Sequence, residues 1–324
     1  MTRPLLAALD LHVSFPHPRG RVRALDGVDI EIAAGETVAL VGESGSGKST
    51  AALTLMGVHR PDSGRVLFDG QDVTGARASA LKALRRQVQM VLQDPYSSLD
   101  PRWTVARILA EPLEAHEWGS REARQRRVAE LMRRVGLPED AAGRRPTEFS
   151  GGQRQRISIA RALALEPRLV IADEPVSALD VSIQAQIINL LLDVQRDTGV
   201  AYLVISHDVA LVHQVADRVV VLYLGQVVEQ GPTDRVIRAP LHPYTVALIS
   251  AVPELEASAD RRRIVLPGEP PSPLSPPSGC AFHPRCPVAR DRCRRERPLL
   301  SDAGSASVAC FFPGELRPPG VRPA

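Results

Sequence analysis

The sequence predicts an α/β fold with a parallel core, an antiparallel β layer before it, an α-helical insert within it and a small C-terminal extension after it. Three apolar stretches predict the core: 37–41 (TVALV), 168–174 (RLVIADE) and 200–206 (VAYLVIS). The first leads directly into a glycine-rich stretch and a helical one, and the other two are separated by a helical stretch from Asp180 to about Asp197. Apolar strands that alternate with helices are typical of a parallel sheet covered on both faces.

The antiparallel layer is predicted from the start of the chain. Leu9, Leu11, Val13 and Phe15 alternate with polar residues, and the stretch 28–32 repeats that alternation. A period of two is typical of strands with one buried and one wet face.

The remaining elements divide the chain. Residues from about 95 to 155 are predicted to form the helical insert, residues 218–231 a hairpin, and a last helix follows Pro243. Half of the 28 prolines lie after residue 250. We therefore expect one domain over 1–252 and a proline-rich linker with a cysteine-bearing extension over 253–324.

Composition excludes several classes of protein. The 324 residues are 44% hydrophobic and carry a net charge of +3, with both signs of charge interspersed, so a nucleic-acid partner is not expected. No apolar run approaches the roughly eighteen residues of a membrane span, and the first residues do not resemble a signal peptide. The chain is expected to stay in the cytoplasm.

The stretch 42–50 (GESGSGKST) fits the pattern of a phosphate-binding loop between a buried strand and a helix. Glycines let the backbone approach phosphate oxygens, and its N–H groups supply positive potential. Lys48 is predicted to reach the β- and γ-phosphates of ATP or GTP, and Ser49 to ligate Mg²⁺. The residues predicted to hold the nucleotide are Gly42, Glu43, Ser44, Gly45, Ser46, Gly47, Lys48, Ser49 and Thr50.

Polar residues at the ends of other strands complete this site. Asp173 is predicted to hold Mg²⁺ through water, and Glu174 to orient or deprotonate the attacking water. An acidic strand end alone is more often a solvated edge, but a phosphate loop in the same chain reverses that preference. Gln93 could contact both the metal's water and the insert, and His207 could hydrogen-bond a γ-phosphate; read alone, both are ordinary polar residues.

A second anion site is predicted where Ser150, Gly151 and Gly152 begin an arginine-rich helix. These residues follow the insert and are not expected to fold back onto their own phosphate loop. The simpler arrangement is two chains placed head to tail, each covering the nucleotide of the other.

The ordered set of 42–50, Gln93, FSGGQ at 149–153, LVIADE, SALD at 177–180 and His207 resembles the nucleotide-binding subunits of ABC transporters over about residues 1–250. The resemblance implies a P-loop NTPase core that binds ATP and Mg²⁺, and a signature Ser150–Gln153 that contacts the γ-phosphate across a dimer. It also adds Asp180 to the nucleotide site and Gln93 to the magnesium site, and it matches Phe15, or else Val22, to the residue that stacks on adenine.

A narrower resemblance rests on LHPYT at 241–245, DPYSSLDPR at 94–102 and the tail, and points to the ATPase subunits of dipeptide, oligopeptide and nickel importers. It implies peripheral association with the cytoplasmic face of the membrane, two permease subunits, an external solute-binding protein and a second ATPase that is a copy or a paralogue. The solute itself, peptide or nickel, stays open. The alternative is a soluble ABC-type mechanoenzyme, which usually has two ATPase halves or a long coiled coil.

The four cysteines of the chain are Cys280, Cys286, Cys293 and Cys310. Disulfides are disfavoured in the cytosol, so a cluster of thiols suggests a metal or chance. Some members of the resembling group hold a [4Fe–4S] centre here, which makes that cluster the first expectation, zinc the second and unliganded thiols the third. His283 could add a ligand. We also interpret the tail as too poor in aliphatic residues to bury a core, which favours a metal staple or a redox-sensitive module.

Overall fold

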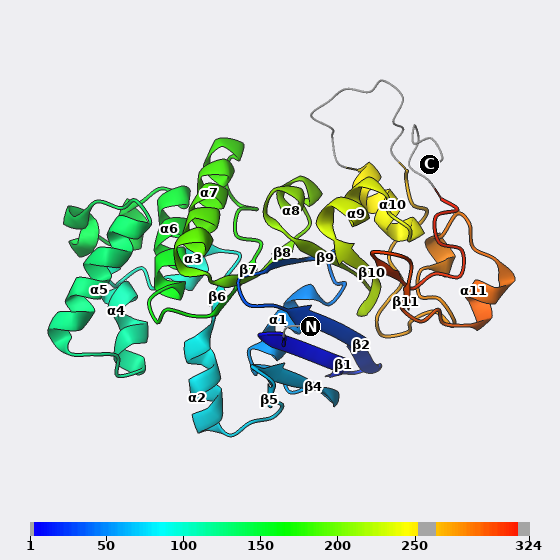
Figure 1. The fold of residues 1–324 in the computed structure, drawn as a ribbon, viewed down its shortest axis with the longest axis horizontal. Coiled ribbons are helices and arrows are strands. Elements are labelled where there is room, and N and C mark those ends of the chain that lie inside the picture. The colour runs from blue at the N-terminus through cyan, green and yellow to red at the C-terminus, as the bar shows by residue number, and fades with distance from the viewer. Residues whose placement is uncertain (1–2, 252–263, 317–324) are drawn as a thin grey trace. The chain divides into compact units, whose positions relative to one another are not determined.

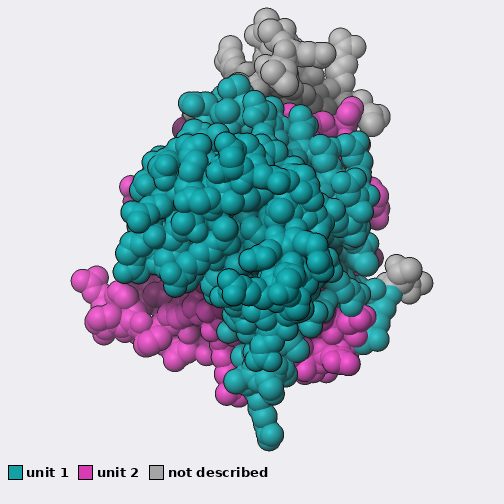
Figure 2. All heavy atoms as spheres, turned by 90° about the vertical axis from the view of Figure 1, so that its left-hand side faces the viewer, with its two compact units in different colours: residues 1–5, 32–37, 76–205 teal, residues 6–31, 38–75, 206–324 magenta. Residues whose placement is uncertain are grey.

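The computed structural model describes residues 3–251 and 264–316, and the start of the predicted linker, 253–263, lies outside them. The chain divides into two compact units, coloured separately in Figure 2. Unit 1 comprises Met1–Leu5, Ile32–Thr37 and Ala76–Ile205, and unit 2 comprises Leu6–Glu31, Val38–Gly75 and Ser206–Ala324.

Unit 1 contains three parallel strands, β6 (Val88–Val91), β7 (Leu169–Asp173) and β8 (Ala201–Ser206). β7 lies between the other two, with Leu169 opposite both Val88 and Ala201. Every residue of β7 and β8 is buried, as expected for strands with both faces covered. The sequence therefore predicted these two strands correctly.

The helices of unit 1 begin at residues that satisfy their first amides. Thr104 accepts a hydrogen bond from the amide of Arg107 at the start of α4, and Ser120 accepts one from Ala123 at the start of α5. α4 and α5 pack against each other and against α6 (Figure 1). The helices of this unit are α2 (Ala78–Gln87), α3 (Pro95–Ser98), α4 (Val105–Ala115), α5 (Arg121–Arg134), α6 (Gly151–Ala162) and α7 (Val181–Thr198), with 3₁₀ turns at Glu139–Gly143 and Pro146–Glu148.

Unit 2 contains the predicted antiparallel layer. Its strands, in the order β2-β1-β4-β5, are β2 (Gly20–Ile32), β1 (Leu6–His17), β4 (Ser63–Phe68) and β5 (Gln71–Asp72). β1 runs antiparallel to β4, with Leu6 opposite Phe68. The buried side chains alternate along β2 near its end, where Val28, Ile30 and Ile32 are covered.

The other strands of unit 2 include the one that leads into the phosphate loop. β3 (Thr37–Val41) runs parallel to β9 (Arg218–Tyr223), and β9 forms the predicted hairpin with β10 (Gln226–Pro232). The helices of this unit are α1 (Lys48–Leu55), α8 (Val209–Val215), α9 (Thr233–Arg238), α10 (Pro243–Ser250) and α11 (Asp291–Arg295), with a 3₁₀ turn at His283–Arg285.

The C-terminal extension shares the core of unit 2. β12 (Ser307–Val308) pairs with β10, and β11 (Ser301–Asp302) pairs with β12. Phe282 is buried against the rings of Tyr223 and Tyr244, at centroid distances of 5.2 and 5.6 Å. The tail, which we expected to be too poor in aliphatic residues to bury a core by itself, packs its buried residues into a core shared with the hairpin and α10.

Candidate functional site

The predicted phosphate loop joins β3 to α1, whose first residue is Lys48. Gly47 precedes the helix with φ 106°, and a Cβ there would lie 2.4 Å from the carbonyl oxygen of Ala24, so only glycine fits. Lys48 is 8% exposed, and its ammonium donates to the carbonyl oxygens of Gly42 (2.7 Å) and Glu43 (2.9 Å). It therefore lies across the loop, where phosphate oxygens could take the place of these acceptors.

Glu43 is fixed at three points. Its amide donates to the Oη of Tyr244 (2.7 Å), its carbonyl accepts from Lys48, and its carboxylate forms a two-pronged ion pair with Arg285 (2.8 and 3.2 Å). Tyr244 is fully buried and Arg285 nearly so. Neither was predicted as a site residue; HPYT was interpreted only as a helix start and a family label.

The start of α10 explains the sequence HPYT. His242 precedes the helix and accepts a hydrogen bond from the amide of Tyr244 (3.1 Å), and Pro243 occupies the first turn. The carboxylate of Glu229, itself buried, accepts from the amides of Leu241 (2.8 Å) and His242 (2.9 Å). Burial lowers the pKa of His242 to about 3 and raises the pKa of Glu229.

The predicted catalytic residues of unit 1 lie together. Asp173 is the last residue of β7 and is 9% exposed, and Glu174 follows it. Glu174 has φ 46°, a strained conformation for this residue, held by a hydrogen bond from its amide to the carbonyl oxygen of Ile205 (2.9 Å). The side-chain amide of Gln93 donates to Glu174 Oε2 (2.9 Å). Gln93 follows β6 by two residues rather than ending it.

The serine-glycine stretch begins α6, as predicted. Ser150 and Gln153 exchange hydrogen bonds between side chain and backbone at 3.3 and 3.0 Å, which forms a capping box. A Cβ on Gly152 would lie 2.5 Å from Ile183 Cγ2, whereas one on Gly151 would meet Leu179 Cδ2 at 3.4 Å. Close packing against Ile183 of α7 therefore explains why position 152 is glycine, without any ligand. Packing gives no such reason for glycine at position 151.

The other predicted nucleotide residues lie on separate elements. Asp180 precedes α7, and its carbonyl oxygen accepts from the amides of Ile183 and Gln184, both at 2.9 Å. His207 follows β8 and is exposed. Phe15 lies on β1 in edge-to-face contact with His59 (5.1 Å), and Val22 lies on β2 half-buried.

All four cysteines and His283 line one small pocket in the extension, together with Phe282 and Phe311. Burial raises the pKa of Cys280, and that of Cys286 to about 12 and Cys310 to about 11. Across residues 3–251 and 264–316, no three His, Cys, Asp or Glu side chains stand where they could share one metal ion.

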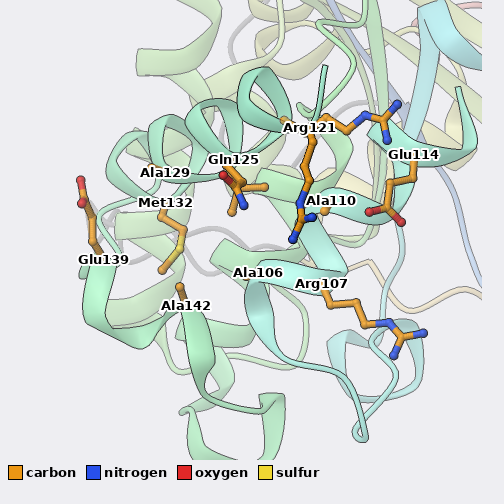
Figure 3. Close-up of a pocket in the computed structure, with 12 residues that line it drawn as sticks. Ala106, Arg107, Ala110, Glu114, Arg121, Gln125, Ala129, Met132, Glu139 and Ala142 are labelled. Atoms are coloured by element: carbon orange, nitrogen blue, oxygen red, sulfur yellow. The ribbon is translucent and has the colours of Figure 1, made fainter. Parts of the chain in front are cut away.

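A groove of about 790 Å³ lies on the helical insert (Figure 3). Its lining comes from α4, α5 and the turn Glu139–Gly143, with Met132 and alanines such as Ala110 and Ala142 forming apolar parts, and Arg107, Glu114 and Arg121 adding charge. None of the helices described here combines the length and apolar character needed to cross a bilayer.

Two family patterns match the chain. Residues 25–177 match the ABC transporter family, and residues 228–293 match the C-terminal region of oligopeptide/dipeptide transporters. The first contains the phosphate loop and the acidic strand end, and the second contains Tyr244, Arg285 and three of the four cysteines.

Curated relatives are similar over nearly the whole chain. The chain is 55% identical to the probable peptide ABC transporter ATP-binding protein y4tS of Sinorhizobium fredii, over 89% of this chain and 82% of the relative. It is 50% identical to the di/tripeptide transport ATP-binding protein DppF of Pseudomonas aeruginosa, over 94% of this chain and 97% of the relative. It is 47% identical to the dipeptide transport ATP-binding protein DppF of Escherichia coli, over 96% of this chain and 95% of the relative.

Solved structures have the same fold. The ATP-binding cassette MJ0796, solved as a dimer in a post-hydrolysis state with ADP and Pi, superposes with a TM-score of 0.65 at 30% identity, covering 70% of this chain and 98% of that one. The cbiO1 protein of Clostridium perfringens, part of the cbiONQ transporter complex, gives the same score and identity, covering 73% and 92%. The chain thus belongs to the ABC transporter family as an ATP-hydrolysing subunit with a P-loop NTPase fold, in the branch that carries the oligopeptide/dipeptide C-terminal region.

Proposed function

We propose that this protein hydrolyses ATP to power the import of di- or oligopeptides through separate permease subunits, at the cytoplasmic face of the membrane. The observation that carries the proposal is the similarity at about half of all positions to peptide-transport ATP-binding proteins, over nearly the full length of both chains. A strain without the protein should lose uptake of a radiolabelled dipeptide, and wild-type protein should restore it. Loss of radioactive nickel uptake in that strain, with dipeptide uptake unchanged, would instead favour nickel as the cargo.

Each residue of the nucleotide site has a proposed role. Lys48 binds the β- and γ-phosphates, Ser49, Asp173 and Gln93 hold Mg²⁺ directly or through water, and Glu174 orients or deprotonates the attacking water. His207 contacts the γ-phosphate and Phe15 stacks on adenine. Support comes from the position of Lys48 across the loop and the hydrogen bond between Gln93 and Glu174. Lys48→Ala should abolish binding of a fluorescent ATP analogue, with Lys82→Ala, the other lysine of the chain, binding as the wild type does.

Two ATPase chains, a second copy or a paralogue, are proposed to clamp ATP head to tail, with Ser150–Gln153 and Asp180 of one serving the nucleotide of the other. The N-terminus of α6 supports this role, because its first amides and helix dipole favour an anion. With ATP and its permease partners, a Glu174→Gln complex should hold two closed ATPase chains. Single chains in that complex would contradict the arrangement.

The groove on the insert is proposed to receive a helical segment of a permease subunit. Its apolar residues offer contacts to the apolar face of such a helix, and its charged residues offer pairs to the polar face. A photo-crosslinking residue at Ala110 should capture a permease in the assembled complex, and one at the exposed Leu299 of the extension should not. Capture of a permease at Leu299 but not at Ala110 would move the contact elsewhere.

The four cysteines are proposed to hold a [4Fe–4S] cluster, with zinc as the alternative. Support comes from the common pocket that the four cysteines line, since four thiolates are the usual ligands of such a cluster. Such a group would staple the extension and could make it sensitive to oxidation. Anaerobically purified protein should contain iron and sulfide and absorb visible light; zinc without iron would select the alternative.

A further inference from the structure

The C-terminal extension reaches the phosphate loop through Arg285, which lies in the turn between Cys280 and Cys286. Arg285 is 7% exposed, and its guanidinium donates to both carboxylate oxygens of Glu43, at 2.8 and 3.2 Å. Glu43 is the second residue of the glycine-rich stretch. A salt bridge with two parallel hydrogen bonds fixes orientation as well as charge, so this contact can hold the loop in one conformation.

Arg285 is itself held in place by the core of unit 2. Its amide donates to the carbonyl oxygen of Phe282 (3.0 Å), and Phe282 is buried among Tyr223, Tyr244 and His242. Tyr244 in turn accepts from the amide of Glu43. The backbone of Glu43 is therefore bound by Tyr244 of α10, and its side chain is bound by Arg285 of the extension. Tyr244 and the turn that carries Arg285 both belong to one aromatic cluster.

The charge of Glu43 gives this contact a consequence for ATP. A phosphate loop works by offering positive potential to a triphosphate, and a carboxylate within that loop opposes it. Arg285 neutralises the carboxylate where water only partly screens it, since the Glu43 side chain is 31% exposed. Without Arg285, the same carboxylate would face the nucleotide unpaired.

We infer that Arg285 is a positioning residue for ATP binding: it pairs with Glu43, keeps the phosphate loop in shape and removes a negative charge that would repel the triphosphate. The extension is thereby part of the nucleotide site and not an appendage to it. This inference rests on the proposed binding of ATP to the loop of 42–50.

The test measures the affinity of a fluorescent ATP analogue for the full chain, with thermal stability recorded in parallel. Arg285→Gln should weaken binding by about tenfold, the effect expected of one unpaired charge near the ligand. The double variant Arg285→Gln with Glu43→Gln should recover most of that affinity, because the repelling carboxylate is gone. The matched control is Arg290→Gln, which removes another arginine of the extension, paired with Glu315 at 2.6 Å.

The possible results distinguish failure of the Arg285 inference from failure of the proposed ATP binding. If wild-type protein binds no ATP analogue, the proposed function fails. If wild type and Arg285→Gln bind equally well, the inference alone is overturned. If Arg285→Gln weakens binding and the double variant does not recover it, the charge argument is overturned. The melting temperature recorded for each variant shows whether the protein is folded at the assay temperature, so recovery of affinity among folded variants supports the pairing specifically.

Discussion

The side-chain amide of Gln93 donates a 2.9 Å hydrogen bond to the carboxylate of Glu174, across 81 positions of the sequence. Glu174 is further constrained by its left-handed backbone and by the bond from its amide to Ile205. The proposed base is thus oriented through both its side chain and its main chain.

Replacing Glu174 by glutamine should slow ATP hydrolysis by about a hundredfold or more, since the amide cannot accept the proton of the attacking water. Binding of ATP should persist, because the phosphate loop is untouched. Single-turnover hydrolysis and analogue binding, measured side by side, check both halves. A variant that hydrolyses ATP at the wild-type rate would remove Glu174 from its role.

Replacing Gln93 by alanine should lower the hydrolysis rate by several-fold to about tenfold, because it removes one hydrogen bond that orients Glu174. In the double variant with Glu174→Gln, the further loss should be small, since both changes act on the same group. Rates for the four proteins of this cycle give the coupling. Independent, multiplying losses would contradict orientation of Glu174 by Gln93.

Gly152→Ala should destabilise unit 1 by about 1–3 kcal/mol, because its Cβ would overlap Ile183 Cγ2. Adding Ile183→Ala should recover part of the loss. Gly151→Ala, whose Cβ makes an ordinary contact, should keep the stability while lowering ATP hydrolysis if Gly151 approaches the partner's nucleotide. Thermal unfolding and hydrolysis assays distinguish the two glycines; equal stability losses would contradict the packing difference.

His242 should make the protein less stable as pH falls. Its pKa is about 3 in the folded chain because of burial, so between pH 6.5 and 3 the unfolded chain binds a proton that the folded one does not. Stability should drop by about 1.4 kcal/mol per pH unit in this window from this group alone.

The control for that prediction is His242→Asn, which retains a side-chain acceptor for the start of α10. Glu229 contributes with the opposite sign because its pKa is raised, but it is present in both proteins and cancels in the comparison. Denaturant unfolding at pH 6.5, 5.5 and 4.5 should give a shallower slope for the variant. Parallel slopes would contradict the assignment to His242.

Local signals in the sequence were enough to predict helices whose ends are marked by capping residues. Ser150 predicted the start of α6, and Gly199 predicted the end of α7, because caps depend on a few adjacent residues. β4 and β5 were not predicted: they are short, and their pairing with β1 depends on residues far away in the chain. The helix α2 also lacked an N-terminal side-chain cap that could mark it, within the part of the chain that the structure describes.

The sequence predicted the identity of many site residues, but it did not predict the contacts between them. The loop of 42–50 and the pair Asp173 and Glu174 carry their pattern within a few residues. The contacts of Glu43 with Tyr244 and Arg285 join positions 201 and 242 apart, and no local pattern encodes them. The pairing of Gln93 with Glu174 likewise depends on β6 and β7 being neighbours.

The pairing of β12 with β10 has a consequence for solubility. Without β12, the backbone of β10 near Val228 and Gln230 would become an open sheet edge able to recruit a strand from another molecule. As folded, the outermost strand at this edge of the sheet is β11, only two residues long and exposed, which offers little for another chain to join. The two short strands of the extension therefore leave less backbone open to edge-to-edge pairing than β10 alone would.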